Sequence, residues 1–265
     1  MADRITELLP PDYPWKDRFL HMDTVDSTND CLKRLGRQNG QHGTVLLADR
    51  QANGHGRLGR SFQSPDGLGV YISVLLRPHC PPEKLMHLTC AAAVVMCQAV
   101  ETVTGISLGV KWINDLVYGG RKLAGIMTEL GFDSQGLVDY AVVGVGLNCN
   151  HRLEDFDPEL REKAGSIAMI CGKPVDRARM AAAMAQAFSR MDADLFTQKD
   201  AVMERYREKC VTVGQEISLI RGDEIRCGKA LSVDADGALS VEFPDGHRES
   251  VNSGEVSVRT AHGYL

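Results

Sequence analysis

The segment 51–62, Gln-Ala-Asn-Gly-His-Gly-Arg-Leu-Gly-Arg-Ser-Phe, constrains the fold more than any other part of the chain. Its three glycines alternate with His55, Arg57 and Arg60, and it directly follows the apolar run 45–48. Glycine permits positive φ and close backbone approach, so that consecutive N–H groups can face one ligand. Arginine offers a planar cationic fork for phosphate or carboxylate oxygens. The segment therefore predicts an anion-binding loop, and the alternative is a flexible basic surface turn.

The same segment differs from two common phosphate-binding loops. A P-loop ends in Gly-Lys-Ser/Thr at the start of a helix, and that tripeptide is absent from the sequence. A dinucleotide-binding fingerprint needs a helix after its last glycine. Here the turn-rich stretch 61–69 and the apolar run 70–76 follow instead. We therefore predict a loop between two strands, one over residues 43–49 and one over residues 70–77.

Charge and composition indicate an ordinary globular protein. Of the 265 residues 43% are hydrophobic and 25% are charged, which are typical values. Thirty Lys+Arg against 35 Asp+Glu give a formal net charge of −5, and this argues against general nucleic-acid binding, which needs a basic surface. The first residues lack the apolar core of a signal peptide, and no run is expected to span a membrane. We therefore expect a cytoplasmic protein without DNA or membrane partners.

The eight cysteines include no Cys-x-x-Cys pair, which predicts reduced thiols in an unsecreted chain. One grouping, His79, Cys80, His87 and Cys90, suggests a metal site. Residues 83–104 read as a long apolar helix, however, so core packing is the favoured explanation. No metal ligand is assigned from the sequence.

A polar cluster, Asp26-Ser-Thr-Asn29, precedes a short predicted helix. Asp26, Ser27 and Thr28 are all favourable N-cap residues, so capping explains one of them. The cluster holds more hydroxyl and amide groups than a cap requires, and the surplus is suited to line a polar ligand pocket. The pattern leaves both roles open.

Residues 107–118 and 121–130 read as two strands joined at Gly119-Gly120, which is a hairpin signal. Lys122 has apolar neighbours in the returning strand, where an unpaired ammonium would be costly to bury. It therefore faces either solvent or an anion. Asn114 and Asp115 suit a metal–nucleotide or a ribose, or they end the strand through Asx hydrogen bonds.

The rest of the chain divides into a mainly helical part and a strand-rich part. A strand over 138–145 precedes an acidic stretch, 151–162, that is expected to be a mobile loop. Helices are predicted over 166–171 and from 177 to about 210. After residue 210 short strands alternate with turns, which predicts a small β-barrel of about 50 residues with a supporting or partner-contact role. The predicted strands are 211–213, 216–220, 225–233, 238–243, 247–251 and 256–258.

Four sequence blocks in order resemble those of the biotin protein ligases, also called biotin–[acetyl-CoA-carboxylase] ligases. The blocks are Asp26-Ser-Thr-Asn29, Gln51-x-x-Gly-His-Gly-Arg-Leu-Gly-Arg60, Lys111-Trp-Ile-Asn-Asp115 and Arg121-Lys-Leu-Ala-Gly-Ile126, with Gly144-Val-Gly-Leu-Asn148 as a weaker fifth. The resemblance covers nearly the whole chain and implies an α+β fold. Residues 1–210 would form a class II synthetase-like mixed β-sheet flanked by helices, the catalytic biotin/lipoate ligase-like domain. Residues 211–265 would form a small C-terminal SH3-like β-barrel.

The resemblance also implies an activity, that of a biotin–[biotin carboxyl-carrier protein] ligase. Such an enzyme activates biotin with ATP and Mg²⁺ as biotinyl-5′-AMP and transfers it to a lysine of a biotin carboxyl carrier protein domain. Pre-placed cations and N–H donors would dominate this catalysis, because negative charge builds on phosphoryl oxygens. Regulatory members carry an N-terminal DNA-binding module, so a ligase without repressor activity is expected here. Family members often pair through a sheet, so a homodimer is a further open expectation.

Residue roles follow from the same match. Arg57 and Lys122 would be catalytic. Biotin would be held by Ser27, Thr28, Asn29, Gln51, His55, Gly56, Arg57 and Lys122. The nucleotide would be held by Arg57, Arg60, Lys111, Trp112, Asn114, Asp115 and Asn148. The glycine loop would become ordered over the adenylate and shield it from water.

Two departures from the family pattern stand out. His55 replaces a usual arginine, and a histidine is only partly charged at neutral pH. Ile113 replaces a usual proline and is expected to alter turn rigidity more than chemistry. The alternatives are a lipoate–protein ligase, a non-catalytic biotin or nucleotide sensor, and a general phosphate-binding scaffold. The Gln51 loop and the C-terminal barrel favour biotin over lipoate.

Overall fold

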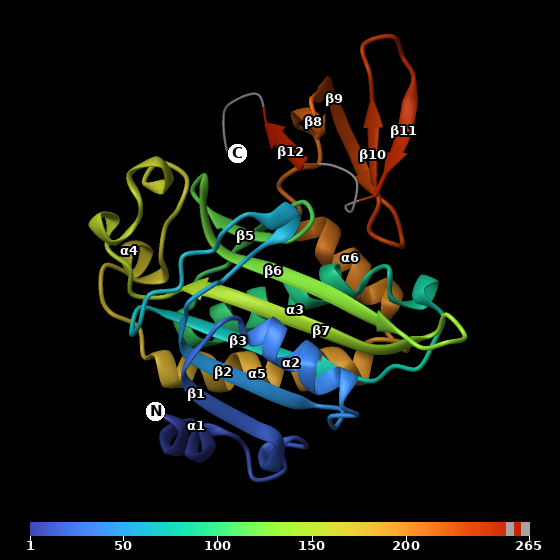
Figure 1. The fold of residues 1–265 in the computed structure, drawn as a ribbon. Coiled ribbons are helices and arrows are strands. Elements are labelled where there is room, and N and C mark those ends of the chain that lie inside the picture. Colours follow the sequence, from blue (N-terminus) through green and yellow to red (C-terminus); the bar gives the residue numbers. More distant parts are fainter. Residues whose placement is uncertain (253–256, 261–265) are drawn as a thin grey trace.

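The computed structural model of the chain describes residues 1–252 and 257–260, and Figure 1 shows its ribbon. Its main sheet has seven strands, in the spatial order β1 (Phe19–Val25), β2 (Thr44–Gln51), β3 (Gly69–Leu76), β7 (Val138–Asn148), β6 (Arg121–Phe132), β5 (Asp115–Tyr118) and β4 (Gly109–Lys111). The strands β1 and β2 run parallel, and the other neighbours are antiparallel. This mixed sheet confirms the expected α+β class.

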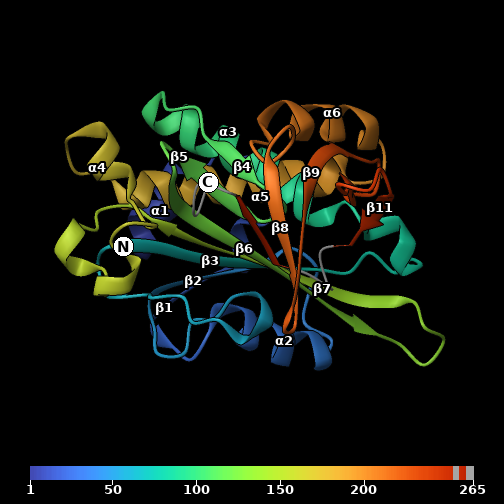
Figure 2. The same ribbon diagram turned by 90° about the horizontal axis from the view of Figure 1, so that it is seen from above.

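Helices cover both faces of the seven-stranded sheet, as Figure 2 shows. On one face α3 (Leu88–Thr104) packs against α5 (Arg177–Asp194) and α6 (Lys199–Lys209). On the opposite face α2 (Thr28–Arg37) lies against β2, β3 and β7. The other helices are short: α1 (Ala2–Leu8), α4 (Ile167–Cys171), η1 (Lys16–Arg18), η2 (Arg57–Gly59), η3 (Pro82–Leu85), η4 (Leu153–Asp155) and η5 (Pro158–Leu160).

Side chains that alternate across β2 divide the interior into two apolar layers. Val45 and Leu47 pack in the large core that contains α3 and α5, whereas Leu46 packs with Leu32 of α2. All of them are buried. A strand that is covered on both faces is apolar without interruption, which explains why this strand is recognisable in the sequence.

The helix α3 is apolar around most of its circumference because it is surrounded by other elements. By length and composition the stretch Pro82–Thr104 is apolar enough to cross a membrane, contrary to the expectation that no run reaches that length. In the folded chain 67% of the most apolar 18 residues of this stretch is buried inside the molecule. Its helix ends at Gly105, whose φ of 74° is that of a left-handed cap.

The helix expected over 177–210 is two helices, because the chain turns between α5 and α6. The N–H groups of Thr197 and Gln198 both donate to the carbonyl of Asp194, at 3.1 and 2.9 Å. The carbonyl of Leu195 lies 2.9 Å from Nε2 of the buried His87 and is thereby satisfied outside the helix. No glycine or proline marks this break, which depends on a tertiary contact.

Other boundaries also differ from the expectations. Residues 112–114 separate β4 from β5, where one continuous strand was predicted. The edge strand β1 was not predicted, since its burial follows no regular alternation. Residues 1–20 are more than a lead-in, because Ile5 and Trp15 are buried in the core and the hydroxyl of Tyr13 donates to Ala185 O at 3.1 Å.

The C-terminal part is an antiparallel five-stranded sheet, drawn in orange and red in Figure 1. Its spatial order is β11 (Arg248–Val251), β10 (Leu239–Glu242), β9 (Glu224–Val233), β8 (Glu216–Arg221) and β12 (Ser257–Thr260). The strand expected over 211–213 is wrong: these residues form a turn, in which Val211 N donates to Val110 O at 2.9 Å. Val256, at the start of the last predicted strand, lies outside the described residues. The boundary between residues 210 and 211 stays a prediction.

Candidate active site

One cavity of about 400 Å³ gathers every residue that the sequence analysis assigned to a site. It lies where the start of α2, the 51–62 segment, the first half of β6, the end of β7 and the C-terminal sheet meet. Its lining includes Ser27, Thr28, Asn29, Gln51, His55, Gly56, Arg57, Arg60, Lys111, Trp112, Asn114, Asp115, Lys122 and Asn148. Segments that are far apart in sequence therefore meet around one space.

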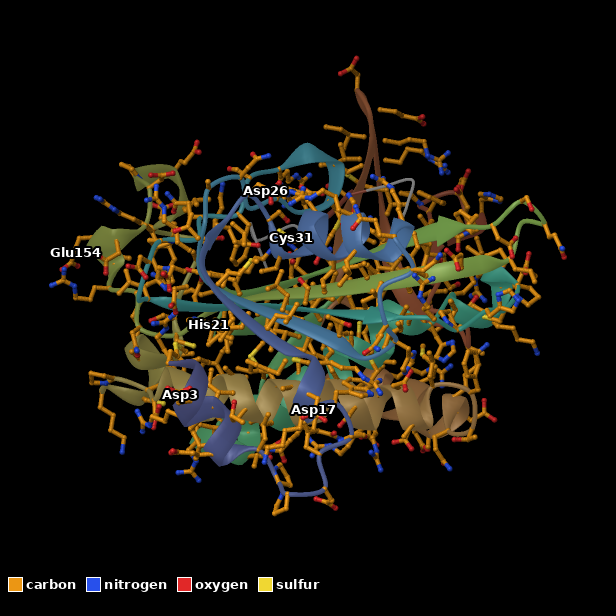
Figure 3. The ribbon with its side chains drawn as sticks, turned by 60° about the horizontal axis from the view of Figure 1, so that its bottom comes forward. Asp3, Asp17, His21, Asp26, Cys31 and Glu154 are labelled. Carbon is orange, nitrogen blue, oxygen red and sulfur yellow. The ribbon has the colours of Figure 1, made fainter. Side chains whose placement is uncertain are left out.

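The Asp26-Ser-Thr-Asn29 cluster both caps α2 and lines the cavity, which are the two roles that the sequence left open. Ser27 is the N-cap of α2 and accepts from Asp30 N. Asp26 does not line the cavity: Arg34 donates to its two oxygens at 2.7 and 3.0 Å, which holds the pKa of this carboxyl well below its usual range. Figure 3 shows Asp26 and Cys31 close together at the start of α2. Asp26 thus forms a surface ion pair, Ser27 both caps the helix and lines the cavity, and Thr28 and Asn29 line the cavity.

Neutral hydroxyl and amide groups line one end of the cavity. Oε1 of Gln51 accepts from the backbone N–H of Thr28 at 2.9 Å and from its hydroxyl at 3.0 Å. The amide of Gln51 donates to the Ser64 hydroxyl at 2.9 Å. These bonds fix the side chains of α2 and β2 relative to each other, so a ligand meets polar groups that are already oriented.

Asn29 is held in the same polar end by residues that the sequence did not reveal. Its Oδ1 lies 2.7 Å from the hydroxyl of Ser73, and its Nδ2 donates to Glu129 Oε2 at 2.9 Å. A Cβ at Gly144 would lie 1.9 Å from Asn29 Oδ1, so only glycine leaves room for the amide. Gly144 belongs to the fifth sequence block. Ser73 and Glu129 carried no signal, because isolated polar residues in strands fit many surfaces.

The glycines of the 51–62 segment serve different purposes. A Cβ at Gly54 would lie 2.6 Å from both Phe62 O and Ser64 Oγ, so close backbone approach requires glycine there. Gly59 has a φ of 69°, which glycine adopts readily. At Gly56 neither reason applies, since its φ is −119° and the nearest atom to an added Cβ is 3.8 Å away. Leu58, with a φ of 57°, is the exposed apolar tip of the segment.

His55, which replaces the usual arginine, lies on the rim of the polar end. Its Nδ1 is 3.2 Å from Asn53 O and 3.8 Å from Asp30 Oδ2. The ring therefore has a local backbone partner and a carboxylate within reach.

Cationic groups line the other end of the cavity. Arg57 on η2 donates to Asn114 Oδ1 at 3.4 Å, which connects the glycine segment to the 111–115 segment. Burial lowers the pKa of Arg57, and the nearby Asp115 carboxylate opposes that shift. Asn114 also donates to Ile126 O at 2.8 Å. Asn114 is therefore anchored to β6 while it contacts Arg57.

Lys122 meets an anion, which is one of the two outcomes that its apolar surroundings allowed. Its Nζ lies 2.5 Å from Asp115 Oδ1 across the β5–β6 pair. The side chain runs over Gly125, where an added Cβ would lie 3.2 Å from Cε and Nζ. The Lys122 backbone is paired with the loop beyond β7, through Lys163 O at 2.7 Å and Gly165 N at 2.9 Å.

Lys111 is a third cation of this end, and only 2% of it is exposed. Burial lowers the pKa of Lys111 to about 8, although the Asp115 carboxylate acts in the opposite direction. Trp112 and Ile113, which follow, are joined by a cis peptide bond. A lysine with a pKa near neutrality is a group whose charge responds to a bound anion.

Phe62 and Arg259 line the cavity but were not assigned to it from the sequence. The Phe62 ring lies above the strands at Gly146, where an added Cβ would be 2.4 Å from the ring. Arg259 belongs to β12, so the C-terminal sheet contributes directly to the cavity. The sequence suggested a supporting or partner-contact role for this part, and its contribution to the cavity lining was not predicted. A basic residue near the end of a chain carries no positional signal.

The acidic stretch that was expected to be a mobile loop forms one wall of the cavity. Phe156 and Glu159 line it, and Asn148 donates to Gly165 O at 3.0 Å. His151 stacks on Phe156, with ring centroids 5.1 Å apart. Burial lowers the pKa of His151 to about 4, so this ring is neutral at physiological pH.

The His79, Cys80, His87 and Cys90 grouping does not form a site among the described residues. His79 is exposed, whereas His87 and Cys90 are buried in the core. Two other groups bring three possible ligand atoms within 4.8 Å of one another, at His21/Asp23/Asp49 and Asp30/His55/Glu129. All eight cysteines are free thiols.

The mixed sheet, its helices and a cavity with a neutral polar end and a cationic end define a catalytic domain of the biotin/lipoate ligase class. The biotin/lipoate A/B protein ligase family matches residues 22–148, and the biotin protein ligase C terminal domain matches residues 212–259. The chain belongs to the biotin protein ligase family.

Individual relatives agree with this assignment. The bifunctional ligase/repressor BirA of Bacillus subtilis is 32% identical over 232 residues, covering 86% of this chain and 70% of the relative. The biotin--[acetyl-CoA-carboxylase] ligase of Mycobacterium tuberculosis is 26% identical, covering 91% and 89%. The structure of the biotin protein ligase from Aquifex aeolicus in complex with biotin and ATP has a TM-score of 0.77 and 28% identity, covering 92% of this chain and 99% of that one.

Proposed function

We propose that this chain is an ATP-dependent ligase that activates biotin as biotinyl-5′-AMP and transfers it to a lysine of a biotin carboxyl carrier protein domain. The observation that carries the proposal is the division of one cavity into a neutral polar end and a cationic end. The bicyclic ring of biotin is neutral and offers hydrogen-bond donors and acceptors, which matches hydroxyl and amide side chains. The phosphate oxygens of a nucleoside triphosphate are suited to arginine and lysine side chains.

The residue roles follow from this division. Ser27, Thr28, Asn29 and Gln51 would hold the biotin ring, with His55 and Gly56 at the rim. Arg60, Lys111, Trp112, Asn114, Asp115 and Asn148 would surround the nucleotide. Arg57 and Lys122 would face both substrates, because the biotin carboxylate and the α-phosphate must meet between the two ends.

In the first step a carboxylate oxygen of biotin attacks the α-phosphorus of ATP, and the bond to pyrophosphate breaks. Negative charge increases on the phosphoryl oxygens and on the leaving group. The side chains of Arg57 and Lys122 donate charge-assisted hydrogen bonds to those oxygens, and they are already oriented by Asn114 and Asp115. Such pre-placed donors need little reorganisation as the transition state forms.

In the second step the amine of the acceptor lysine attacks the acyl carbon of the mixed anhydride. The bond to AMP breaks, the amine loses a proton, and an amide remains on the carrier. Water would compete with the amine for the same carbon. The 51–62 segment and the wall formed by Phe156 enclose the cavity on two sides, and they would limit the entry of water.

Asp115 is a carboxylate of this cavity that suits Mg²⁺. Mg²⁺ is commonly held by one or two protein carboxylates together with substrate phosphates, and Asp115 lies beside the cations that would face those phosphates. When bound, the ion would neutralise phosphate charge. Asp115 would hold Mg²⁺ only when nucleotide supplies the remaining ligands.

Homodimer formation, a cytoplasmic location and the absence of DNA binding are further parts of the proposal. The net charge of −5 supports the last of these, because nucleic-acid affinity comes largely from basic surface. Sedimentation of the chain with and without biotin and ATP tests the oligomeric state. Titration of labelled duplex DNA at low salt tests DNA binding, and saturation at submicromolar protein would contradict the proposal.

Biotin-dependent pyrophosphate release from ATP tests the function. We expect release with biotin and none with lipoate in its place. Lipoate-dependent release without biotin-dependent release would favour a lipoate ligase, a reading that the C-terminal domain match disfavours. Binding of biotin and ATP without any release of pyrophosphate would indicate a sensor.

Nucleotide binding is expected to take up a proton at pH 8.5 and little at pH 6.5. Because burial lowers the pKa of Lys111 to about 8, most of this lysine is neutral at pH 8.5 in the free protein, and a bound polyphosphate favours the charged form. The lowered pKa also means that the free energy of unfolding rises with pH between the folded value and the ordinary value of 10.5.

Calorimetry of ATP binding in buffers with different ionisation enthalpies measures this proton uptake. Roughly half a proton or more per nucleotide is expected at pH 8.5. The control is Lys111→Met, in which the uptake is lost. Equal uptake in the wild-type chain and in this variant would contradict the role of Lys111.

A further inference from the structure

The C-terminal part holds the 111–115 segment in place through two buried hydrogen bonds. The backbone N–H of Trp112 donates to the hydroxyl of Thr212 at 2.9 Å, and the indole N–H of Trp112 donates to Gly237 O at 2.9 Å. Thr212 is completely buried, and Trp112 is 4% exposed. The two residues that flank Trp112 in the sequence, Lys111 and Ile113, are buried as well. The C-terminal part thus contacts the segment from two positions.

The Gly237 contact comes from the turn 234–238, which joins β9 to β10. Asp234 Oδ1 accepts from the N–H groups of Asp236 and Ala238, both at 2.9 Å, so the turn has a defined shape. Gly237 has a φ of 91°, and an added Cβ there would lie 2.9 Å from Cys90 Sγ in α3. The turn is therefore packed tightly against the catalytic part.

We infer that Thr212 and the 234–238 turn are positioning residues that set the nucleotide end of the cavity through Trp112. Neither touches the cavity itself, but the segment they hold carries Lys111, Asn114 and Asp115 into it. The polar end depends on α2, β2 and β3 and makes none of these contacts. The inference rests on the proposed function. It predicts that loss of either contact with Trp112 raises the KM for ATP and leaves the KM for biotin almost unchanged.

The first test removes one hydrogen bond. Thr212→Val deletes the hydroxyl that accepts from Trp112 N–H at nearly constant volume, and Thr212→Ser retains it. Pyrophosphate release measured against ATP and against biotin should show an about 10-fold higher KM for ATP in Thr212→Val, since a buried N–H without its partner forces the segment to shift. The KM for biotin should change less than about twofold, and Thr212→Ser should restore the KM for ATP to within about twofold.

The second test compares two glycines in turns of the same sheet. Gly246, in the β10–β11 turn, has a φ of 81° and nothing within 4 Å of an added Cβ. Its turn has the same backbone hydrogen bonds as the other one: Phe243 N donates to His247 O at 2.8 Å as Asp234 N does to Ala238 O at 3.0 Å, and Gly246 N donates to Phe243 O at 2.9 Å as Gly237 N does to Asp234 O at 3.4 Å. Gly246→Ala therefore introduces similar backbone strain without the clash at α3. Gly237→Ala should raise the KM for ATP by about 10-fold, and Gly246→Ala should leave it unchanged even where both lower Tm.

The outcomes separate the inference from the function on which it rests. Wild-type turnover together with an unaltered KM for ATP in Thr212→Val overturns the inference alone, whether or not Gly237→Ala folds. An equal rise of both KM values, or a rise in Thr212→Ser as large as in Thr212→Val, also overturns it. A wild-type chain that releases no pyrophosphate with biotin overturns the proposed function and the inference together.

Discussion

Lys122→Ala is expected to slow biotin-dependent pyrophosphate release by about 100-fold. The ammonium lies in the cavity 2.5 Å from Asp115, on a strand that is paired on both sides. Charge-assisted hydrogen bonds contribute roughly 1.5–3 kcal/mol each, or about ten- to a hundred-fold in rate. We expect the upper end, because the charge faces oxygens that become more negative in the transition state.

Single-turnover formation of biotinyl-5′-AMP measures this effect without a contribution from carrier binding. Lys229→Ala is the matched control, because Lys229 is an exposed strand lysine of the C-terminal sheet. Wild-type turnover in Lys122→Ala would show that Lys122 takes no part in the reaction. Equal losses in both variants would indicate a general effect of lost positive charge.

Arg57→Ala is expected to lower kcat/KM for ATP by about ten- to a hundred-fold, because it removes a charge-assisted hydrogen bond of the same strength. Arg57→Lys should recover only part of this loss, because an ammonium cannot donate two parallel hydrogen bonds to one phosphate. The variant also loses the contact with Asn114 at 3.4 Å that connects the glycine segment to the 111–115 segment.

Initial rates over a range of ATP concentrations, at saturating biotin, measure the effect of Arg57. Arg205→Ala on α6 serves as the control, since this arginine is exposed and lies outside the cavity. If Arg57→Ala and Arg205→Ala give the same kcat/KM as the wild-type chain, Arg57 does not contact the nucleotide.

The core of the site was predictable because its groups lie in short, compositionally unusual blocks. The 51–62 segment combines glycine and arginine beside an apolar strand, and Lys122 is a charge in an apolar run. Each pattern limits the chemistry that the residue can serve. The resemblance to a ligase family placed these blocks around one reaction, and the cavity brings all of them together.

Other parts of the site depend on contacts that a local pattern does not encode. Arg259 reaches the cavity because the C-terminal sheet packs beside the 111–115 segment, where the β9–β10 turn accepts a hydrogen bond from Trp112. Ser73 and Glu129 are ordinary strand residues until Asn29 lies between them. The break between α5 and α6 depends on a contact with His87. Tertiary packing decides each of these features.

Intact-mass analysis of a biotin carboxyl carrier domain tests the ligase activity most directly. The domain is incubated with the chain, ATP, Mg²⁺ and biotin, beside a carrier in which the acceptor lysine is replaced by arginine. We predict the addition of one biotinyl group to the lysine-bearing carrier and none to the other. A carrier mass that stays unchanged, under conditions where the chain is folded and saturated with both substrates, would contradict the proposed transfer.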